Sequence, residues 1–403
     1  MAALLPVFYS TVAAGSLPRN VATAYWGYTT SISLLAAALL SPIIGAAADL
    51  TGRRKRTLLV AAFLGAVGTA LLATVGEGEW KKASLFYVAG HIPFVVSFVC
   101  YDSLLPFVAR KKDLDRVSTR GFAIGYLGGG ILLLLNTAMV LAPHRFLLPS
   151  AEAAIRFSFI TVSLWWLVFS LPLARSVSEP PASGGAAPVS LGTIVARTFS
   201  SLYETLHEIR RHGEPMKFLI AFWLYADGIG TVIKMAVIYG AEVGIGRNDL
   251  IGALLLVQFI GLPCSLLFGK IAGRIGARSG ILIGLTVYTA IAGGGYFLSK
   301  PWHFWLLAVL VGTVQGGTQA LSRSLFATLI PKEKSGEWFG FYSVSGRFAG
   351  IAGPFLFAAT GHLTGSSRFG ILTLVLFFAG GALLLRRVNV PTRAGEAEGA
   401  PSA

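Results

Sequence analysis

Long apolar stretches recur along this chain, and each is long enough to cross a lipid bilayer as a helix. A spanning helix needs about 20 mostly apolar residues. Only 13% of the residues are charged and 54% are hydrophobic, so a water-soluble chain of this size could not bury its apolar surface. The sequence therefore predicts an all-α integral membrane protein. Eleven full spans are expected, at 22–48, 57–76, 83–108, 120–142, 153–174, 216–241, 250–272, 280–298, 303–330, 338–360 and 368–386.

The first residues, Met1–Gly15, are apolar but too few for a full span. At about 1.5 Å per residue they reach about 20 Å, against a hydrocarbon core of about 30 Å. We interpret them as the C-terminal part of a first span whose beginning is missing from this chain. A re-entrant or interfacial segment is the alternative interpretation. With this segment counted, the spans number 12.

One long polar connection separates the first six spans from the last six. It opens with Pro, Ser and Gly, which is linker composition. Apolar residues at helical spacing over 191–211, bordered by arginines, predict an amphipathic helix on the membrane surface. We expect an N-terminal six-helix bundle at 1–174, a cytoplasmic linker at 175–214, a C-terminal six-helix bundle at 215–388 and a disordered cytoplasmic tail at 389–403.

The basic residues are concentrated in alternate loops, for example at 53–56, 110–116 and 270–278. Cytoplasmic loops of membrane proteins carry such an excess of Lys and Arg. Both termini are therefore expected in the cytoplasm, and the protein in a bacterial cytoplasmic membrane. This topology explains the net charge of +15 without a nucleic-acid partner.

A loop motif follows the span at 22–48 and reads Gly45-Ala-Ala-Ala-Asp49-Leu-Thr-Gly52-Arg53-Arg54. Its glycines allow two helices to approach closely and to turn sharply. Asp49 can lie near a positive helix N-terminus or a basic side chain, and the arginines can anchor at an anionic leaflet. A degraded copy lies six spans later, with Gly273 in place of the aspartate and Arg274 after it. The two copies indicate an internal repeat.

This loop resembles the signature of the major facilitator superfamily. Segments at 101–106, 115–121, 125–130 and 316–324 are similar to its vacuole-effluxer-like branch. The resemblance implies a major facilitator fold of two pseudo-symmetric six-helix bundles and a transport function. Eukaryotic members of the branch are linked to amino-acid release from the vacuole, so amino acids are the substrate class that the resemblance implies. Members normally begin with a complete first helix.

Two opposite charges lie in the seventh span, at Asp227 and Lys234. A separation of seven residues is about two helical turns, which places both on one helix face about 10 Å apart. Charges inside a membrane are costly and usually line a cavity or meet a partner on another helix. We expect either a substrate or proton-coupling role, or a structural gate between the repeats. Gly346, Gly350, Gly353 and Pro354 are expected bending points in the span at 338–360.

Other polar residues within the spans complete the candidate sites. Asp102 and Arg347 are expected to contribute, with Asp49 and Arg120, to a cytoplasmic gate, although a substrate role for the first two stays open. Arg323 could equally belong to a gate or bind a carboxylate or another anion in a central cavity. Inter-helix hydrogen bonding is the usual role of neutral polar groups, and cavity lining is the alternative. These neutral groups include Gln315, Gln319 and Asn136.

The sequence predicts a monomeric secondary transporter of small solutes that works by alternating access and is coupled to protons through Asp227. No catalytic constellation, metal-ligand spacing or phosphate-binding loop is present in the sequence. We therefore expect no enzymatic activity and no cofactor, with membrane lipid and a small solute as partners. A transport-inactive scaffold or receptor of the same fold and a passive facilitator are the alternatives.

Overall fold

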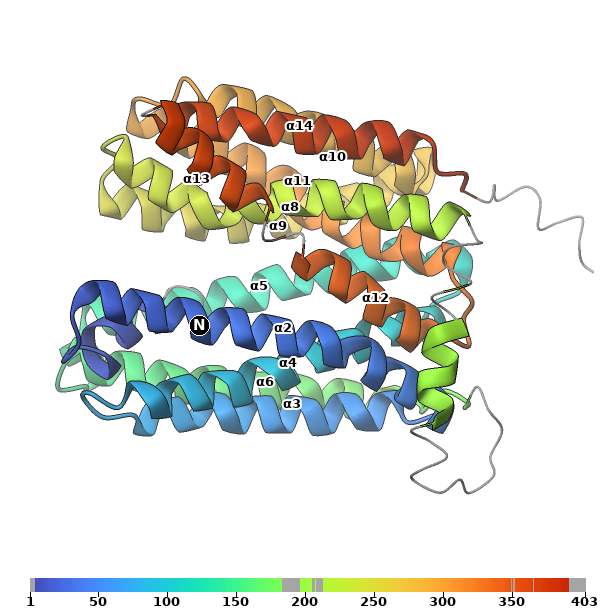
Figure 1. Ribbon diagram of the computed structural model, residues 1–403, viewed down its shortest axis with the longest axis horizontal. Helices are drawn as coiled ribbons and strands as arrows, with labels where there is room; N and C mark the ends of the chain where they lie inside the picture. Colours follow the sequence, from blue (N-terminus) through green and yellow to red (C-terminus); the bar gives the residue numbers. More distant parts are fainter. Residues whose placement is uncertain are drawn as a thin grey trace, which may run out of the picture. The chain divides into compact units, whose positions relative to one another are not determined.

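The computed structural model describes residues 4–182, 196–204, 207, 213–348, 350, 352–364 and 366–390 (Figure 1). Every regular element in these ranges is helical. The contacts divide the chain into two compact units. Unit 1 comprises 1–104, 131–202 and 333–341, and unit 2 comprises 105–130, 203–332 and 342–403.

Unit 1 is built on long helices near the start of the chain. Its α3 and α6 run side by side (Figure 1). Two helices are shared with unit 2: α5 (Leu114–Leu141), which belongs here from residue 131 onward, and α12 (Ser335–Phe348), of which residues 335–341 belong here. The elements of unit 1 are α1 (Leu4–Phe8), η1 (Tyr9–Ala13), α2 (Arg19–Thr51), α3 (Arg54–Leu71), η2 (Leu72–Thr74), most of α4 (Trp80–Val108), η4 (Pro143–Phe146) and α6 (Ala151–Ser176).

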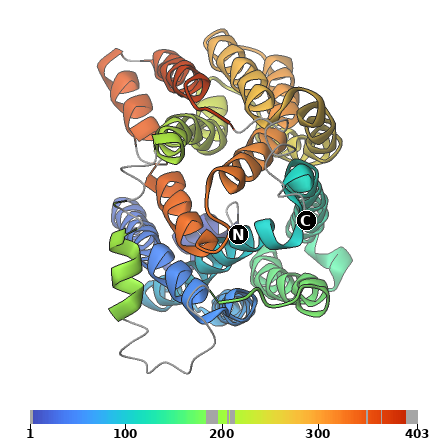
Figure 2. The same ribbon diagram turned by 90° about the vertical axis from the view of Figure 1, so that its right-hand side faces the viewer.

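Unit 2 holds the first part of α5 and the helices that follow the linker. Helix α8 packs against α14, and α9 packs against α11; Figure 2 shows these long helices nearly end on. The elements of unit 2 are α5 (Leu114–Leu141) up to residue 130, η3 (Lys111–Asp113), α8 (Gly213–Glu242), α9 (Arg247–Ile275), α10 (Ala277–Gly295), α11 (Pro301–Leu329), the end of α12 (Ser335–Phe348), α13 (Ala352–Thr364) and α14 (Ser367–Arg386).

Nine helices among the described residues are long and apolar enough to cross a membrane. The expected span at 280–298 corresponds to the shorter helix α10, which is outside this set. The expected single span at 338–360 is instead two helices, α12 and α13, with Gly350 described between them. Hydropathy along the sequence detects apolar length and does not register an interruption of the helix, so the span was expected to be continuous.

The outer surface of the long helices is apolar. Leu39 on α2, Ile124 on α5 and Leu376 on α14 are each more than 60% exposed. Exposed leucine and isoleucine on this scale would be unfavourable in water and are expected where lipid is the solvent. The buried positions between the helices hold small and aromatic residues, which supports close helix packing.

The apolar N-terminal segment packs into unit 1. Leu5, Phe8 and Tyr9 are buried in a cluster that also includes Phe159 of α6. Phe8 and Phe159 meet edge to face with ring centroids 5.3 Å apart. The Tyr9 hydroxyl lies 3.0 Å from Ser84 Oγ of α4. This segment therefore contributes to the core of the unit.

Candidate functional sites

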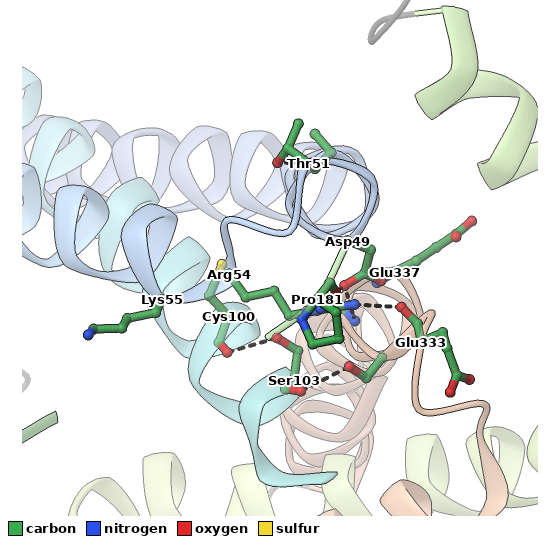
Figure 3. Close-up of polar contacts among 12 residues, drawn as sticks. Asp49, Thr51, Arg54, Lys55, Cys100, Ser103, Pro181, Glu333 and Glu337 are labelled. Atoms are coloured by element: carbon green, nitrogen blue, oxygen red, sulfur yellow. Dashed lines mark hydrogen bonds and ion pairs between the residues drawn. The ribbon is translucent and has the colours of Figure 1, made fainter. Parts of the chain in front are cut away.

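The loop motif of unit 1 forms a buried ion pair at the end of α2. Arg54 Nε donates to Asp49 Oδ1 at 2.5 Å, and both side chains are almost completely buried (Figure 3). Gly52 ends α2 with a φ of 63°, a left-handed conformation that glycine adopts without strain. This turn brings the start of α3 back toward Asp49. Arg53 is exposed beside the pair.

The same carboxylate caps the N-terminus of α12. Gly336 N donates to Asp49 Oδ1 at 3.0 Å, and Glu337 N donates to Asp49 Oδ2 at 2.9 Å. Amides in the first turn of a helix have no intrahelical partner, and the positive end of the helix dipole favours an anion there. The sequence-based expectation allowed Asp49 either a helix N-terminus or a basic side chain. The structure gives it both.

Arg54 uses its remaining donors on backbone carbonyls. Its Nη1 donates to Pro181 O at 3.1 Å, and its Nη2 donates to Glu333 O at 2.5 Å (Figure 3). Nearby, Ser335 Oγ donates to Ser103 O at 2.9 Å. The guanidinium therefore joins the motif to the start of the inter-repeat linker and to the segment before α12.

The linker also caps α3. Lys55 N and Arg56 N donate to the two carboxylate oxygens of Glu179, at 2.6 and 3.1 Å. The N-cap residue of α3, Arg53, makes no capping hydrogen bond with its own side chain. A carboxylate at this place satisfies two otherwise unpaired amides of the first helical turn. Sequence reasoning missed Glu179, because a cap supplied from more than 120 residues away leaves no local pattern.

We expect Glu179→Ala to lower the free energy of unfolding by about 1 kcal/mol, the usual cost of losing an N-cap. Chemical unfolding of the detergent-solubilised protein measures the change. Glu77→Ala is the matched control, because Glu77 is an exposed loop carboxylate. Equal stability of the two variants would show that the Glu179 contact contributes nothing.

The second copy of the motif, in unit 2, is different. Gly273 and Arg274 are both exposed on α9, and a Cβ atom at Gly273 would meet open space. The close contact in this copy occurs at Gly269, where a Cβ atom would lie 2.2 Å from Thr119 Oγ1 of α5. A gating role for Gly273 and Arg274 stays a prediction.

Arg323 lies in a polar contact between α11 and α5 of unit 2. Its Nε donates to Ser118 Oγ at 3.0 Å, and its Nη2 donates to Ser118 O at 3.2 Å. The guanidinium also stacks over Phe122, 5.0 Å from the ring centroid, and is only 5% exposed. The next residue, Ser324, donates to Asp115 Oδ1 at 2.6 Å. This environment supports an inter-helix contact for Arg323 more than an open anion site.

Asp227 lies at the middle of α8 and is completely buried. Its Oδ2 accepts a hydrogen bond from Gly353 N of α13 at 2.9 Å. Its Oδ1 is buried and has no hydrogen-bond partner among the described residues. Lys234, two turns further along α8, is exposed and donates to Gly350 O at 3.3 Å. The two charges thus meet the same backbone segment from one face of α8.

The other candidate residues are dispersed. Asn136 is buried in unit 1, where its Oδ1 accepts a hydrogen bond from Thr161 Oγ1 of α6 at 2.9 Å, as expected of an inter-helix contact. In unit 2, Gln315 and Gln319 are half-buried on α11, and Gln315 lies beside the Tyr126 hydroxyl.

Of the expected gate residues, Asp49 and Asp102 lie in unit 1, and Arg120 lies in unit 2. Asp102 is half-buried on α4 in unit 1, and Arg120 is exposed on α5 in unit 2. The side chain of Arg347 lies outside the described part of the chain. Asp49 instead meets Arg54, Gly336 and Glu337. The gate formed by Asp49, Asp102, Arg120 and Arg347 stays a prediction.

The fold is that of a major facilitator superfamily transporter. The solved proton:xylose symporter XylE, bound to 6-bromo-6-deoxy-D-glucose, matches with a TM-score of 0.69 at 14% identity and covers 96% of this chain and 91% of its own. The human organic anion transporter MFSD10 matches with a TM-score of 0.66 at 14% identity, over 95% of this chain and 93% of its own.

The chain belongs to the family described as vacuole effluxer Atg22 like, whose model matches residues 11–398. The MFS-type transporter YxiO of Bacillus subtilis, itself described as uncharacterized, is 36% identical over 399 residues, which cover 97% of this chain and 90% of that protein. Autophagy-related protein 22-1 of Penicillium rubens is 25% identical over 460 residues, covering 93% and 76%. The protein is therefore a membrane transporter.

Proposed function

We propose that this protein is a proton-coupled secondary transporter that moves small solutes, with amino acids as the substrate class, out of the cytoplasm by alternating access. The observation that carries the proton coupling is Asp227, a fully buried carboxylate at the middle of α8 with one oxygen left without a hydrogen bond among the described residues. A buried carboxylate of this kind can bind a proton from one side and release it to the other. The family model, a vacuole effluxer, supports efflux.

Asp49 and Arg54 have a complementary role in this proposal. Asp49, paired with Arg54, accepts hydrogen bonds from the first amides of α12, and these contacts stabilise one conformation of the transporter. In this proposal they break when the transporter switches between its inward-open and outward-open states. The basic loops support a topology with both termini in the cytoplasm and a location in the bacterial cytoplasmic membrane. We propose that each monomer transports on its own, as two contiguous six-helix bundles at 1–174 and 215–388.

Transport in proteoliposomes tests the proposal directly. With one coupled proton, a gradient of one pH unit can drive about tenfold accumulation of solute. We expect the wild-type protein to accumulate amino acids against their gradient. Asp227→Asn should lose the accumulation and keep exchange of solute at equal pH, because only the proton step is removed.

Asp249→Asn is the matched control, since Asp249 is a carboxylate in the first turn of α9 that accepts a hydrogen bond from Trp305 Nε1 of α11 at 2.9 Å. It should accumulate solute as the wild type does. Saturable flux that ignores both the pH gradient and Asp227→Asn would instead identify a passive facilitator. Absence of any flux for a broad set of amino acids, peptides and drugs would favour a transport-inactive scaffold.

A further inference from the structure

Two charged residues of α8 contact the later part of the expected span 338–360. Asp227 accepts a hydrogen bond from Gly353 N, and Lys234 donates one to Gly350 O. We propose that proton binding at Asp227 releases the start of α13 from α8, so that Gly350 and the first two residues of α13, which we call the junction, convert proton binding into movement. This inference rests on the proposed function, because it assigns a structural response to the same proton site.

The first contact is between Asp227 and the N-terminus of α13. Gly353 is the second residue of α13, so its amide is one of those without an intrahelical partner. Asp227 Oδ2 accepts that hydrogen bond at 2.9 Å in a site closed to solvent. A negative charge at this end of the helix is also favoured by the helix dipole. The ionised carboxylate therefore stabilises the start of α13 where it lies.

The backbone of α13 lies directly on α8 at this point. A Cβ atom at Gly353 would be 2.1 Å from Thr231 Oγ1 and 2.8 Å from Asp227 Oδ1, so only glycine fits. Thr231 Oγ1 in turn donates to Asp227 O at 2.7 Å. This close approach makes the contact sensitive to any change at the carboxylate, because no flexible side chain separates the two helices.

The second contact is made by Lys234 on the preceding part of the same segment. Lys234 Nζ donates to Gly350 O at 3.3 Å, three residues before the amide that Asp227 binds. Helix α8 thus provides an acceptor, Asp227, for the amide of Gly353 and a donor, Lys234, for the carbonyl of Gly350. The negative side chain meets a backbone donor and the positive side chain meets a backbone acceptor, so neither needs the other as a direct partner.

A proton can bind Asp227 at Oδ1, the oxygen without a hydrogen-bond partner among the described residues. Lys234 on the same helix interacts with this carboxylate through its positive charge. Neutralisation removes the charge that favours the helix N-terminus and weakens the hydrogen bond from Gly353. Other helices packed against α8 also carry charged or titratable groups among the described residues. Helix α11 carries His303 and Arg323, which contacts Ser118, and α12 carries Tyr342, which stacks on Phe222 of α8. Further groups are His362 on α13, Arg368 and Arg386 at the ends of α14, and Arg247, Asp249, Cys264, Lys270 and Arg274 on α9.

Hydrogen–deuterium exchange of the full chain in detergent tests this inference, because it reads the amides of α13 and does not depend on transport. Peptides that cover the start of α13 are compared across pH after correction for the intrinsic exchange rate. In the wild type, we expect protection to fall about tenfold as Asp227 is protonated, the size expected for loss of a charged cap. Asp227→Asn should show the lower protection at every pH.

Two further variants sharpen the comparison. Asp249→Asn should keep the wild-type pH step, and Lys234→Gln should raise the exchange of the Gly350 amide while keeping the step at α13. Protection of α13 that does not change with pH in the wild type, or a step that persists in Asp227→Asn, would overturn the inference.

The exchange data and the transport assay separate the two proposals. If Asp227→Asn loses proton-driven accumulation while α13 exchanges as in the wild type at all pH values, Asp227 carries the proton and the junction does not respond to it. A pH step at α13 that depends on Asp227, found in a protein without proton-driven transport, would support the junction and overturn the proposed function.

Discussion

Replacing Arg54 with methionine is expected to lower the free energy of unfolding by about 3–5 kcal/mol, the cost of leaving one member of a buried ion pair without its counter-charge. The Arg54 side chain is completely buried and donates to Asp49, Pro181 O and Glu333 O. Methionine has a similar length and no donor, so these three acceptors lose the hydrogen bonds that Arg54 donates to them. Unfolding of the purified protein by SDS in mixed micelles measures the free energy.

Two variants control this experiment. Arg53→Met removes the neighbouring exposed arginine and should change stability by less than about 0.5 kcal/mol. Asp49→Asn combined with Arg54→Met removes both charges and should recover part of the loss, since an uncompensated buried charge is the main cost. The role given to the pair would be wrong if Arg54→Met and Arg53→Met unfolded alike.

The second large effect is expected at Gly45, where α2 meets the start of α12. A Cβ atom at Gly45 would lie 2.2 Å from Gly336 O and 2.7 Å from Gly336 C, which are backbone atoms that no side-chain rotation can move. Gly45→Ala must therefore push α12 away from α2 and lengthen the hydrogen bond from Gly336 N to Asp49. We expect a loss of about 1–3 kcal/mol, typical of overpacking.

Gly273→Ala is the matched control for Gly45→Ala. Gly273 lies in α9 within the degraded copy of the motif, and a Cβ atom there would meet nothing within 4 Å. Alanine is favoured over glycine inside a helix by about 0.5–1 kcal/mol, so this variant should be as stable as the wild type or slightly more stable. Thermal exposure of the buried thiol of Cys100, in a Cys264→Ser background, compares all three proteins. A Gly45→Ala protein that melts with the wild type would contradict the close contact.

The sequence was sufficient to predict the class of fold and most of the helices. Apolar stretches such as 83–108 and 303–330 correspond to α4 and α11, because length and hydropathy directly express what a bilayer requires. The division into α12 and α13 was not predicted. Gly350, Gly353 and Pro354 suggested bending, but the contacts that α8 makes with Gly350 O and Gly353 N depend on helix packing, which the sequence does not show.

For the candidate sites, the sequence identified charged residues and not their partners. Asp227 and Lys234 were predicted from their cost inside a membrane, and their two-turn spacing does bring both to one segment. Gly336 and Gly353 take part through backbone amides, which any residue but proline carries, so their roles have no signature in the chain. Ser118 was part of a family motif, but its contact with Arg323 depends on the packing of α5 against α11.

The contacts of the early linker suggest where the polypeptide can be divided for biochemical work. Glu179 caps α3, Pro181 accepts from Arg54, and a Cβ atom at Gly52 would lie 2.8 Å from Ala182 N. A split transporter expressed as two separate polypeptides should therefore keep residues up to Ala182 on its first fragment. A cut placed before Glu179 would separate the α2–α3 corner from the residues that complete it.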